Sequence, residues 1–262
     1  MPTPDPTPRV LLAAGGALLT FAVLMGCGGP ADDAGPEKRG FGPAGDRLTI
    51  SSGSGELTVR PSDVDEIEVK RWFTGWSLIG AKTRATWELS GETLTLATDC
   101  ASLVIGRCDV RYEVLVPRHV ALTVGGTNGQ ITASGFDKAL RIDSDNGAIR
   151  VEDASGPLSL GTSSGELRAL GITSGRVTAE SENGEIHLSF TGVPDQVEAT
   201  ADNGTVTVEL PDASYNVTTT TDSSDVRTDV PKDPGSPHAI TVRTDNGAIN
   251  VRTTGRAPHG SP

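Results

Sequence analysis

The sequence is poor in aromatic residues, in cysteine and in long hydrophobic runs, and each shortage excludes some classes of protein. Aromatic residues make up 4% and hydrophobic residues 35% of the 262 positions. That is too little for a large globular core but adequate for thin, repeated layers. Acidic residues outnumber basic ones by 34 to 22, and the net charge of −12 argues against nucleic acid as a partner. The length allows one or two domains.

The one long apolar run lies near the N-terminus, where Arg9 precedes a stretch from Val10 to Met25. Such a run is short for a membrane-spanning helix, which needs about 20 apolar residues. A charge, a short apolar core and small residues before a cleavage site are typical of a secretory signal peptide, which we assign to residues 1–26. The alternative is an uncleaved N-terminal anchor. Either reading predicts that the body of the protein lies outside the cytoplasm.

The end of this segment, Leu24-Met25-Gly26-Cys27, resembles the lipobox of bacterial lipoproteins. The resemblance implies lipidation of Cys27 and anchoring to the outer face of the bacterial cell membrane. Residues 27–46 are rich in Gly, Pro, Ala and charge, and they are predicted to form a flexible tether between the anchor and the body.

The two remaining cysteines, Cys100 and Cys108, form an even pair in a protein that is predicted to be extracytoplasmic. This predicts a disulfide that closes a small loop over residues 101–107. Two free thiols are the alternative. Neither cysteine has a Cys or His neighbour at metal-ligand spacing, which argues against zinc.

A short phrase recurs between Thr127 and Val251: a polar residue, Asn or Ser, Gly, any residue, and then Ile, Leu or Val. Successive copies lie 18 to 23 residues apart, which is typical of repeats that stack into solenoids. The copy at Asp222 has Ser in place of Gly. The copies begin at Thr127, Asp145, Ser163, Glu182, Asp202, Asp222 and Asp245.

Each repeat contains two runs in which apolar and polar residues alternate, for example Ile149 and Val151, then Leu158 and Leu160. Period two predicts a strand with one buried face, and Asn-Gly supplies the tight turn. One long antiparallel meander is conceivable. It would leave its apolar face uncovered, because the sequence has no helical stripe. We therefore favour an all-β fold, a β-solenoid or β-roll of two facing sheets over residues 125–252, followed by a disordered tail at 253–262.

Residues 47–124 are predicted to form an irregular, β-rich N-terminal cap, beginning with a degenerate coil at Leu48 to Val59. Val116-Pro117-Arg118 then leads into Val120 to Val124 and the Asn-Gly-x-Ile turns. This order resembles the DUF4097 family, bacterial envelope proteins regarded as adhesins with β-strand repeats. The resemblance covers roughly residues 47–252. It implies the β-repeat fold and carries over no catalytic residues.

The residue that opens the phrase is acidic in the last four copies, at Glu182, Asp202, Asp222 and Asp245. If the coils stack in register, these carboxylates form a column with a spacing of about 5 Å. One interpretation is a calcium ladder, because Ca²⁺ binds several carboxylate and carbonyl oxygens. The other is turn chemistry, in which an Asp side chain bonds its own backbone. No other cofactor is predicted.

Aromatic residues concentrate at Trp72, Phe73 and Trp76, and Trp87 follows soon after. One interpretation is an exposed patch that binds a sugar ring or a partner protein. The other is that these side chains cover the open end of the solenoid, which must be capped.

We assign no catalytic residues. The sequence predicts a non-enzymatic, lipid-anchored envelope protein that presents a rigid β-solenoid for adhesion, or for binding cell-wall polymer or another envelope protein. A first alternative is a calcium-assisted, polysaccharide-active β-helix enzyme, which would need Arg150 or Arg168 facing the carboxylate column. A second is an accessory subunit in envelope-stress signalling.

Overall fold

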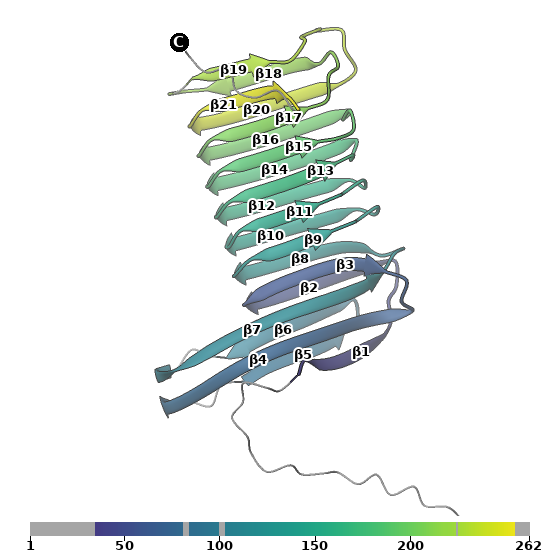
Figure 1. Ribbon diagram of the computed structural model, residues 1–262, viewed down its shortest axis with the longest axis vertical. Coiled ribbons are helices and arrows are strands. Elements are labelled where there is room, and N and C mark those ends of the chain that lie inside the picture. The colour runs from purple at the N-terminus through teal and green to yellow at the C-terminus, as the bar shows by residue number, and fades with distance from the viewer. Residues whose placement is uncertain (1–34, 81–83, 100–102, 224, 255–262) are drawn as a thin grey trace, which may run out of the picture. The chain divides into compact units, whose positions relative to one another are not determined.

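The computed structural model describes residues 35–80, 84–99, 103–223 and 225–254, and the regular elements in this part of the chain are all β-strands. The strands wind into a stack of coils, and each coil contributes one strand to each of two facing sheets (Figure 1). The predicted all-β fold of two facing sheets is therefore confirmed. Within the described ranges, no helix is long and apolar enough to cross a membrane.

Both sheets continue along the whole stack. In spatial order, sheet A contains β1 (Glu37–Pro43), β4 (Glu66–Gly80), β7 (Leu103–Pro117), β3 (Glu56–Ser62), β9 (Ile131–Ser134), β11 (Ile149–Glu152), β13 (Leu167–Ile172), β15 (Ile186–Phe190), β17 (Val206–Leu210), β21 (Ile249–Thr253) and β19 (Val226–Asp229). Sheet B contains β18 (Asn216–Thr221), β20 (Ala239–Asn246), β16 (Gln196–Asn203), β14 (Arg176–Asn183), β12 (Leu158–Ser164), β10 (Leu140–Asn146), β8 (Ala121–Asn128), β2 (Arg47–Ser54), β6 (Thr93–Asp99) and β5 (Arg84–Ser90).

Neighbouring coils pair in parallel and in register, so each copy of the repeated phrase occupies the same place in its coil. The turn residues that lie side by side are Asn128, Asn146, Ser164, Asn183, Asn203 and Asn246. The alternation of apolar and polar residues along each strand then places the apolar side chains in the core. In β16, Val197 and Ala199 are buried while Glu198 is exposed. Because every coil adds such apolar residues from both sheets, a continuous core runs through the stack.

Glycine at the turn sets how closely two coils approach. A Cβ at Gly184 would lie 2.0 Å from the carbonyl oxygen of Gly165 in the preceding coil, and a Cβ at Gly247 would lie 2.0 Å from that of Gly204. No side chain fits at such a distance. The glycine of the repeated phrase is therefore required by stacking as well as by the shape of the turn.

The N-terminal region departs from the predicted boundaries in two ways. Glu37–Pro43 form strand β1, which pairs with β4, so the prediction of a tether over the whole of 27–46 is wrong for these residues. Strands β2 and β3 form a regular coil, because Ser54 pairs with Asn128 and Leu57 with Ile131 in the repeat register. The stack therefore begins earlier than the predicted boundary at residue 125.

The rest of the N-terminal region closes one end of the stack. Strands β4 and β7 pair antiparallel on sheet A, and the hairpin of β5 and β6, which connects them in the chain, pairs on sheet B. The edge strands β1 and β5 meet through Phe41 and Trp87, whose rings lie 6.4 Å apart at 78°. Arg71 lies over the Trp87 ring at 4.2 Å. This aromatic contact joins the two sheets at their exposed edges.

The last two coils are exchanged relative to their order in the sequence. Strands β20 and β21 lie between the coil β16/β17 and the coil β18/β19, so the last coil of the chain is an internal layer (Figure 1). The long segment 230–238 makes this crossing possible, and the backbone groups of Tyr215 bond to Pro231 and Asp233 within it. The Gly-free copy at Asp222 belongs to the outermost coil, where Val217 and Thr219 are only half-buried. The outermost coil has a neighbouring coil on one side only, so it can move outward to make room for a turn residue other than glycine.

Candidate functional site

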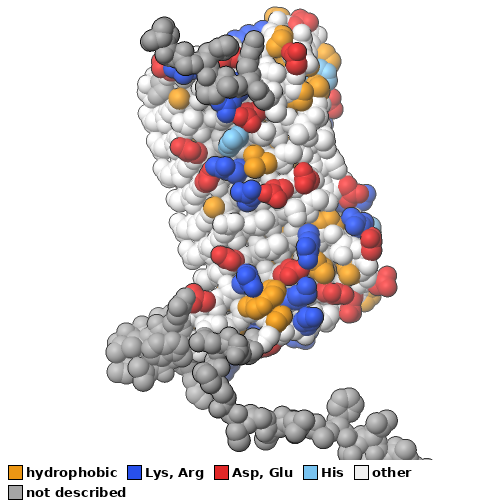
Figure 2. Space-filling model, viewed as in Figure 1, with side chains coloured by type: hydrophobic (Ala, Val, Ile, Leu, Met, Phe, Trp, Pro, Cys, Tyr) orange, Lys and Arg blue, Asp and Glu red, His pale blue; other side chains and the backbone are white. Residues whose placement is uncertain are grey.

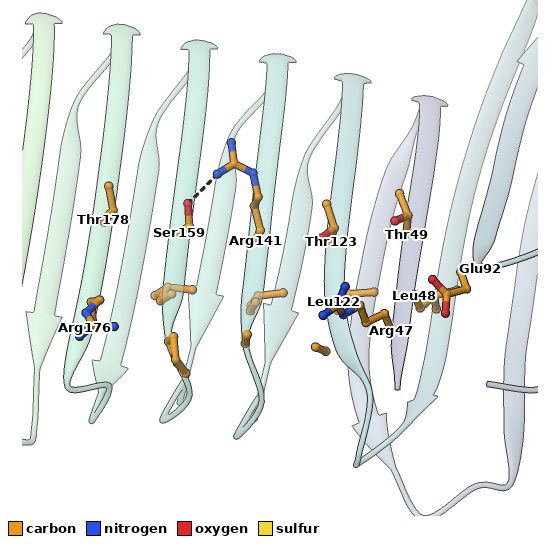
Figure 3. Close-up of a pocket in the computed structure, with 15 residues that line it drawn as sticks. Arg47, Leu48, Thr49, Glu92, Leu122, Thr123, Arg141, Ser159, Arg176 and Thr178 are labelled. Carbon is orange, nitrogen blue, oxygen red and sulfur yellow. Dashed lines mark hydrogen bonds between the residues drawn. The ribbon is translucent and has the colours of Figure 1, made fainter. Parts of the chain in front are cut away.

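The candidate functional site is a groove on the outer face of sheet B, at the end where its strands begin; we call it the sheet B groove. It has a volume of about 580 Å³ and crosses the five adjacent strands β2, β8, β10, β12 and β14 (Figure 3). The turn before β6 adds Glu92 to one end. Five coils therefore build one elongated surface.

Alternation along the strands determines what lines the groove. Leu122 is buried in the core, so its neighbours Ala121 and Thr123 face outward. At the first outward position the middle coils carry small residues and both end coils carry arginine. In spatial order these residues are Arg47, Ala121, Ala139, Pro157 and Arg176. At the second outward position they are Thr49, Thr123, Arg141, Ser159 and Thr178.

The arginines of the groove differ in their partners. Arg141 is held by Asp143, with Nε and Nη2 at 2.8 and 2.9 Å from the two carboxylate oxygens, and it donates to Ser159 Oγ at 3.1 Å. Arg47 and Arg176 are exposed, and neither forms an ion pair with any residue that the structure describes. Figure 3 shows these two side chains on either side of the residues between them. The groove thus carries two arginines without an ion-pair partner in the described residues and one carboxylate, Glu92, at the Arg47 end.

The predicted carboxylate column exists, but in a different order and without a metal geometry. Asp245 lies between Asp202 and Asp222, because the last two coils are exchanged. Glu182 is 3.5 Å from Ser163 Oγ, and Asp245 is 3.6 Å from Arg243 Nε. In the described part of the chain, no three Asp, Glu, His or Cys side chains converge so as to hold a metal ion. The geometry gives the calcium interpretation no support.

The asparagines of the turns have a clear structural role. Asn203 Nδ2 donates to Asn183 Oδ1 at 3.1 Å, and Asn246 Nδ2 donates to Asn203 Oδ1 at 3.2 Å. Ser223 Oγ lies 3.3 Å from Asn246 Oδ1 and extends the series to the outermost coil. We call this series the asparagine ladder. It ties neighbouring turns together through their side chains, a role that the Asn-Gly turn pattern did not predict.

Two of the three residues of the predicted aromatic patch, Trp72 and Phe73, lie on different faces of β4. Trp72 lies on the outer face of sheet A with Arg111 4.3 Å above its ring. Phe73 follows it in the same strand, and adjacent strand residues face opposite sides. The side chain of Trp76 lies outside the described part of the structure. Covering of the open end is the role of Trp87, through its contact with Phe41, rather than of Trp72.

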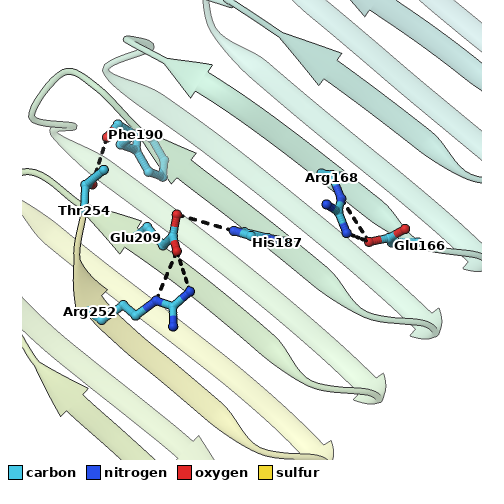
Figure 4. Close-up of polar contacts among 7 residues, drawn as sticks. All are labelled: Glu166, Arg168, His187, Phe190, Glu209, Arg252 and Thr254. Atoms are coloured by element: carbon cyan, nitrogen blue, oxygen red, sulfur yellow. Dashed lines mark hydrogen bonds and ion pairs between the residues drawn. The ribbon is translucent and has the colours of Figure 1, made fainter. Parts of the chain in front are cut away.

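A second polar cluster lies on the outer face of sheet A (Figure 4). Glu209 accepts hydrogen bonds from Arg252 Nε at 3.0 Å and Nη2 at 2.5 Å, and His187 Nε2 lies 3.5 Å from its other oxygen. Burial alone would raise the pKa of Glu209, but hydrogen bonds from Arg252 and Ser189 outweigh it, so this pKa is lowered. Because the serine bonds to the carboxylate rather than to the imidazole, the cluster does not have the geometry of a hydrolytic triad.

Two further sequence features bear on catalysis. Gly161 to Gly165 has the Gly-x-Ser-x-Gly spacing of a nucleophile elbow. It occupies the end of β12 and the following turn, whereas the elbow requires a strand-to-helix turn. Arg150 and Arg168 lie on sheet A, where they pair with Glu152 and Glu166, so they do not face the carboxylate column on sheet B. Figure 4 shows the pair of Arg168 and Glu166.

Two of the three cysteines at the predicted covalent sites fall outside the described residues. Cys27 lies in the undescribed N-terminal segment, and Cys100 lies in the gap before β7. Cys108 is part of β7. Lipidation of Cys27 and a disulfide between Cys100 and Cys108 stay predictions. The distribution of charge on one face of the described body is shown in Figure 2, where acidic and basic side chains are interspersed.

Comparison with known proteins supports the fold. A family model described as Toastrack DUF4097 matches residues 43–252. A solved structure titled a "putative adhesin" from Parabacteroides distasonis is similar to 83% of this chain over 98% of its own length, with 10% identity and a TM-score of 0.50.

Two further structures are similar at lower TM-scores. A "putative adhesin" from Bacteroides fragilis covers 83% of this chain and 96% of its own, with 13% identity and a TM-score of 0.46. A "putative lipid binding protein" from P. distasonis covers 85% of this chain and 98% of its own, with 15% identity and a TM-score of 0.43. At these identities the likeness shows the fold alone. No curated protein matched the sequence.

Proposed function

Because the chain belongs to the Toastrack DUF4097 family, we propose that it is a non-enzymatic protein of the bacterial cell envelope that presents its rigid outer faces for adhesion or for binding an envelope component. The observation that carries this proposal is the sheet B groove. Five coils contribute to it, so it suits an extended partner better than a compact small molecule. The similar structure from Parabacteroides distasonis titled "putative adhesin" supports the adhesive part of the proposal.

Rigidity supports a role as a binding scaffold. Backbone pairing in register, the close approach of turn glycines and the asparagine ladder each fix one coil against the next. A surface held in this way loses little conformational entropy when it binds, so more of the contact energy is retained as affinity. The relative placement of groove residues from different coils is therefore preset.

A lipid anchor on Cys27 is the second part of the proposal. It rests on the lipobox-like sequence Leu24-Met25-Gly26-Cys27 and would place the body at the outer face of the membrane. Cells that produce the full chain or its C27A variant can be fractionated with detergent phase separation. The wild-type protein should enter the detergent phase and C27A should not. Equal partitioning of the two proteins would contradict lipidation.

Adhesion is tested by sedimentation of the detergent-solubilised full chain with purified cell walls, with and without a chelator. We expect sedimentation that survives chelation and weakens in an R47A/R176A variant. Sedimentation that is lost on chelation would instead revive a cation site at the carboxylate column. No sedimentation with cell walls would contradict the proposal and would favour a protein partner, such as a membrane sensor, that co-purifies with the chain.

The enzymatic alternative receives no support from the described side chains. A polysaccharide-active β-helix needs acidic and basic residues converging on one groove. Here Arg150 and Arg168 are held by glutamates on the sheet opposite the carboxylate column. Release of reducing ends from an acidic polysaccharide by the purified protein would restore this alternative.

A further inference from the structure

We propose that the sheet B groove binds a linear anionic polymer, which lies along the stacking direction of the coils and contacts Arg47 and Arg176 at the two ends. This inference rests on the proposed function and specifies the chemistry of the ligand. The shared chemistry is a chain of repeating phosphate or carboxylate groups.

The length of the groove favours an extended ligand. Arg47 and Arg176 belong to coils four steps apart, because β2, β8, β10, β12 and β14 are consecutive in sheet B. At the usual strand spacing their Cα atoms are roughly 19 Å apart. Figure 3 shows the row of outward side chains between them, running across the strands rather than along one strand. One ligand reaches both arginines only if it runs in that direction.

The charged residues of the groove favour an anionic ligand. The whole chain has a net charge of −12, yet the groove is lined by three arginines and one glutamate. Arg141 is already neutralised by Asp143, whereas Arg47 and Arg176 have no ion-pair partner in the described residues. A free guanidinium offers a fork of donors that matches phosphate and carboxylate oxygens. The two end positions are therefore sites for anionic groups of the ligand.

The middle of the groove suits the uncharged backbone of such a polymer. Ala121, Ala139 and Pro157 have no long side chain, and they leave room between the two arginines. The hydroxyls of Thr123 and Ser159 lie on the coils on either side of Arg141 and can donate to or accept from hydroxyl groups of a sugar or polyol chain. A polymer laid here meets a similar polar group at nearly every coil.

Other polyanionic partners fit less well. Single-stranded nucleic acid is usually held by aromatic side chains on which bases stack, and among the described residues none that lines the groove is aromatic. An anionic membrane is a broad surface, and it would contact the exposed arginine tips without entering the concave floor between them. The groove therefore favours a single polymer chain.

The test measures binding of the full-length, detergent-solubilised protein by titration calorimetry. Long-chain inorganic polyphosphate is the phosphate probe, polygalacturonate is the carboxylate probe, and dextran is the neutral control. We expect at least one anionic polymer to bind and dextran not to bind. The arm that binds more tightly identifies the anionic group.

Variants locate the binding. R47A/R176A removes both end charges, and a loss of about tenfold or more in affinity is expected. The matched control R84A/R227A removes the same charge from exposed arginines outside the groove, neither of which has an ion pair within the described residues. This control should stay within about twofold of wild type. The slope of log affinity against log salt should fall by roughly one for each groove arginine removed.

Several outcomes would overturn the inference: binding of neither polymer, equal losses in the two double variants, or binding to vesicles of anionic phospholipid without binding to either polymer. The adhesion proposal is judged separately by sedimentation with cell walls. Wild-type protein that sediments with walls but binds neither polymer refutes the polymer inference alone. Polymer binding without wall sedimentation refutes the adhesion proposal and leaves the groove assignment in place.

Discussion

Replacement of Gly184 by alanine tests whether turn glycines set the spacing of the coils. The added Cβ would lie 2.0 Å from the carbonyl oxygen of Gly165 and 2.9 Å from its carbonyl carbon. Both atoms belong to backbone, so neither can rotate away, and the coils must separate by about 1 Å to restore a normal contact. The separation also strains the backbone bond that joins the same two coils, from Gly165 N to Asn183 O, which is 3.3 Å long.

Three contributions determine the expected change in the free energy of unfolding. Overpacking costs about 1–3 kcal/mol, and the weakened backbone bond costs about 1 kcal/mol. Alanine recovers about 0.4–1 kcal/mol, because it restricts the unfolded chain. The free energy of unfolding should therefore fall by about 2 kcal/mol, which corresponds to a decrease in Tm of roughly 4–8 °C for a body of this size.

The assay is urea or thermal unfolding followed by circular dichroism, with G125A as the matched control. Gly125 lies in β8, and a Cβ there meets no atom within 4 Å. G125A should be as stable as wild type, or more stable by up to about 1 kcal/mol. If G184A unfolds at the same midpoint as G125A, close glycine contacts do not determine the stacking, and the argument from turn geometry is wrong.

Three further predictions concern side chains. N203A removes the central member of the asparagine ladder and should cost about 1 kcal/mol in urea unfolding, because two exposed hydrogen bonds are lost; no change would assign the asparagines to turn shape alone. The pKa of Glu209 is lowered from its ordinary value of 4.5, so the folded carboxylate binds fewer protons than the unfolded one, and its contribution is lost as pH falls through the folded pKa. Wild-type stability should therefore decline more steeply than that of E209Q below about pH 4.5, and parallel pH profiles would show that Arg252 does not stabilise the ionised form. C108S should lower the free energy of unfolding by about 2.5 kcal/mol if Cys100 and Cys108 are joined, and mass spectrometry of unreduced peptides should show the linked pair; a free thiol on either residue would contradict the pairing.

The repeated coils were predictable because their information is local. Ile149 and Val151, or Leu158 and Leu160, alternate with polar residues, and each of these residues is buried as the pattern predicts. The fixed spacing of the Asn-Gly phrase then aligned one coil with the next. Strand positions, burial and two-sheet winding all follow from these short-range signals.

The candidate groove was not predictable from such signals, because it joins residues that are far apart in the sequence. Arg47 lies beside Ala121 in the sheet although the two are far apart in the sequence. The chain between them forms β4 to β7 on the other side of the coil β2/β3 before it returns to β8. Each groove residue occupies an ordinary outward position, so its own repeat gives no indication of a site. The exchange of the last two coils was also missed. Two local features of the sequence indicated this exchange: the glycine-free copy at Asp222 and the long segment 230–238.

The exchanged coils bear on how the chain is completed during synthesis. The outermost coil, β18/β19, emerges from the ribosome before the layer on which it rests, because β20 and β21 are the last strands made. In the finished stack, β16 and β17 contact β20 and β21 on that side, and the outermost coil pairs with β20 and β21. A chain released early, before residue 239, therefore lacks an internal layer rather than an end. Such an incomplete product exposes strand edges that proteases and chaperones can recognise, whereas the finished chain covers them.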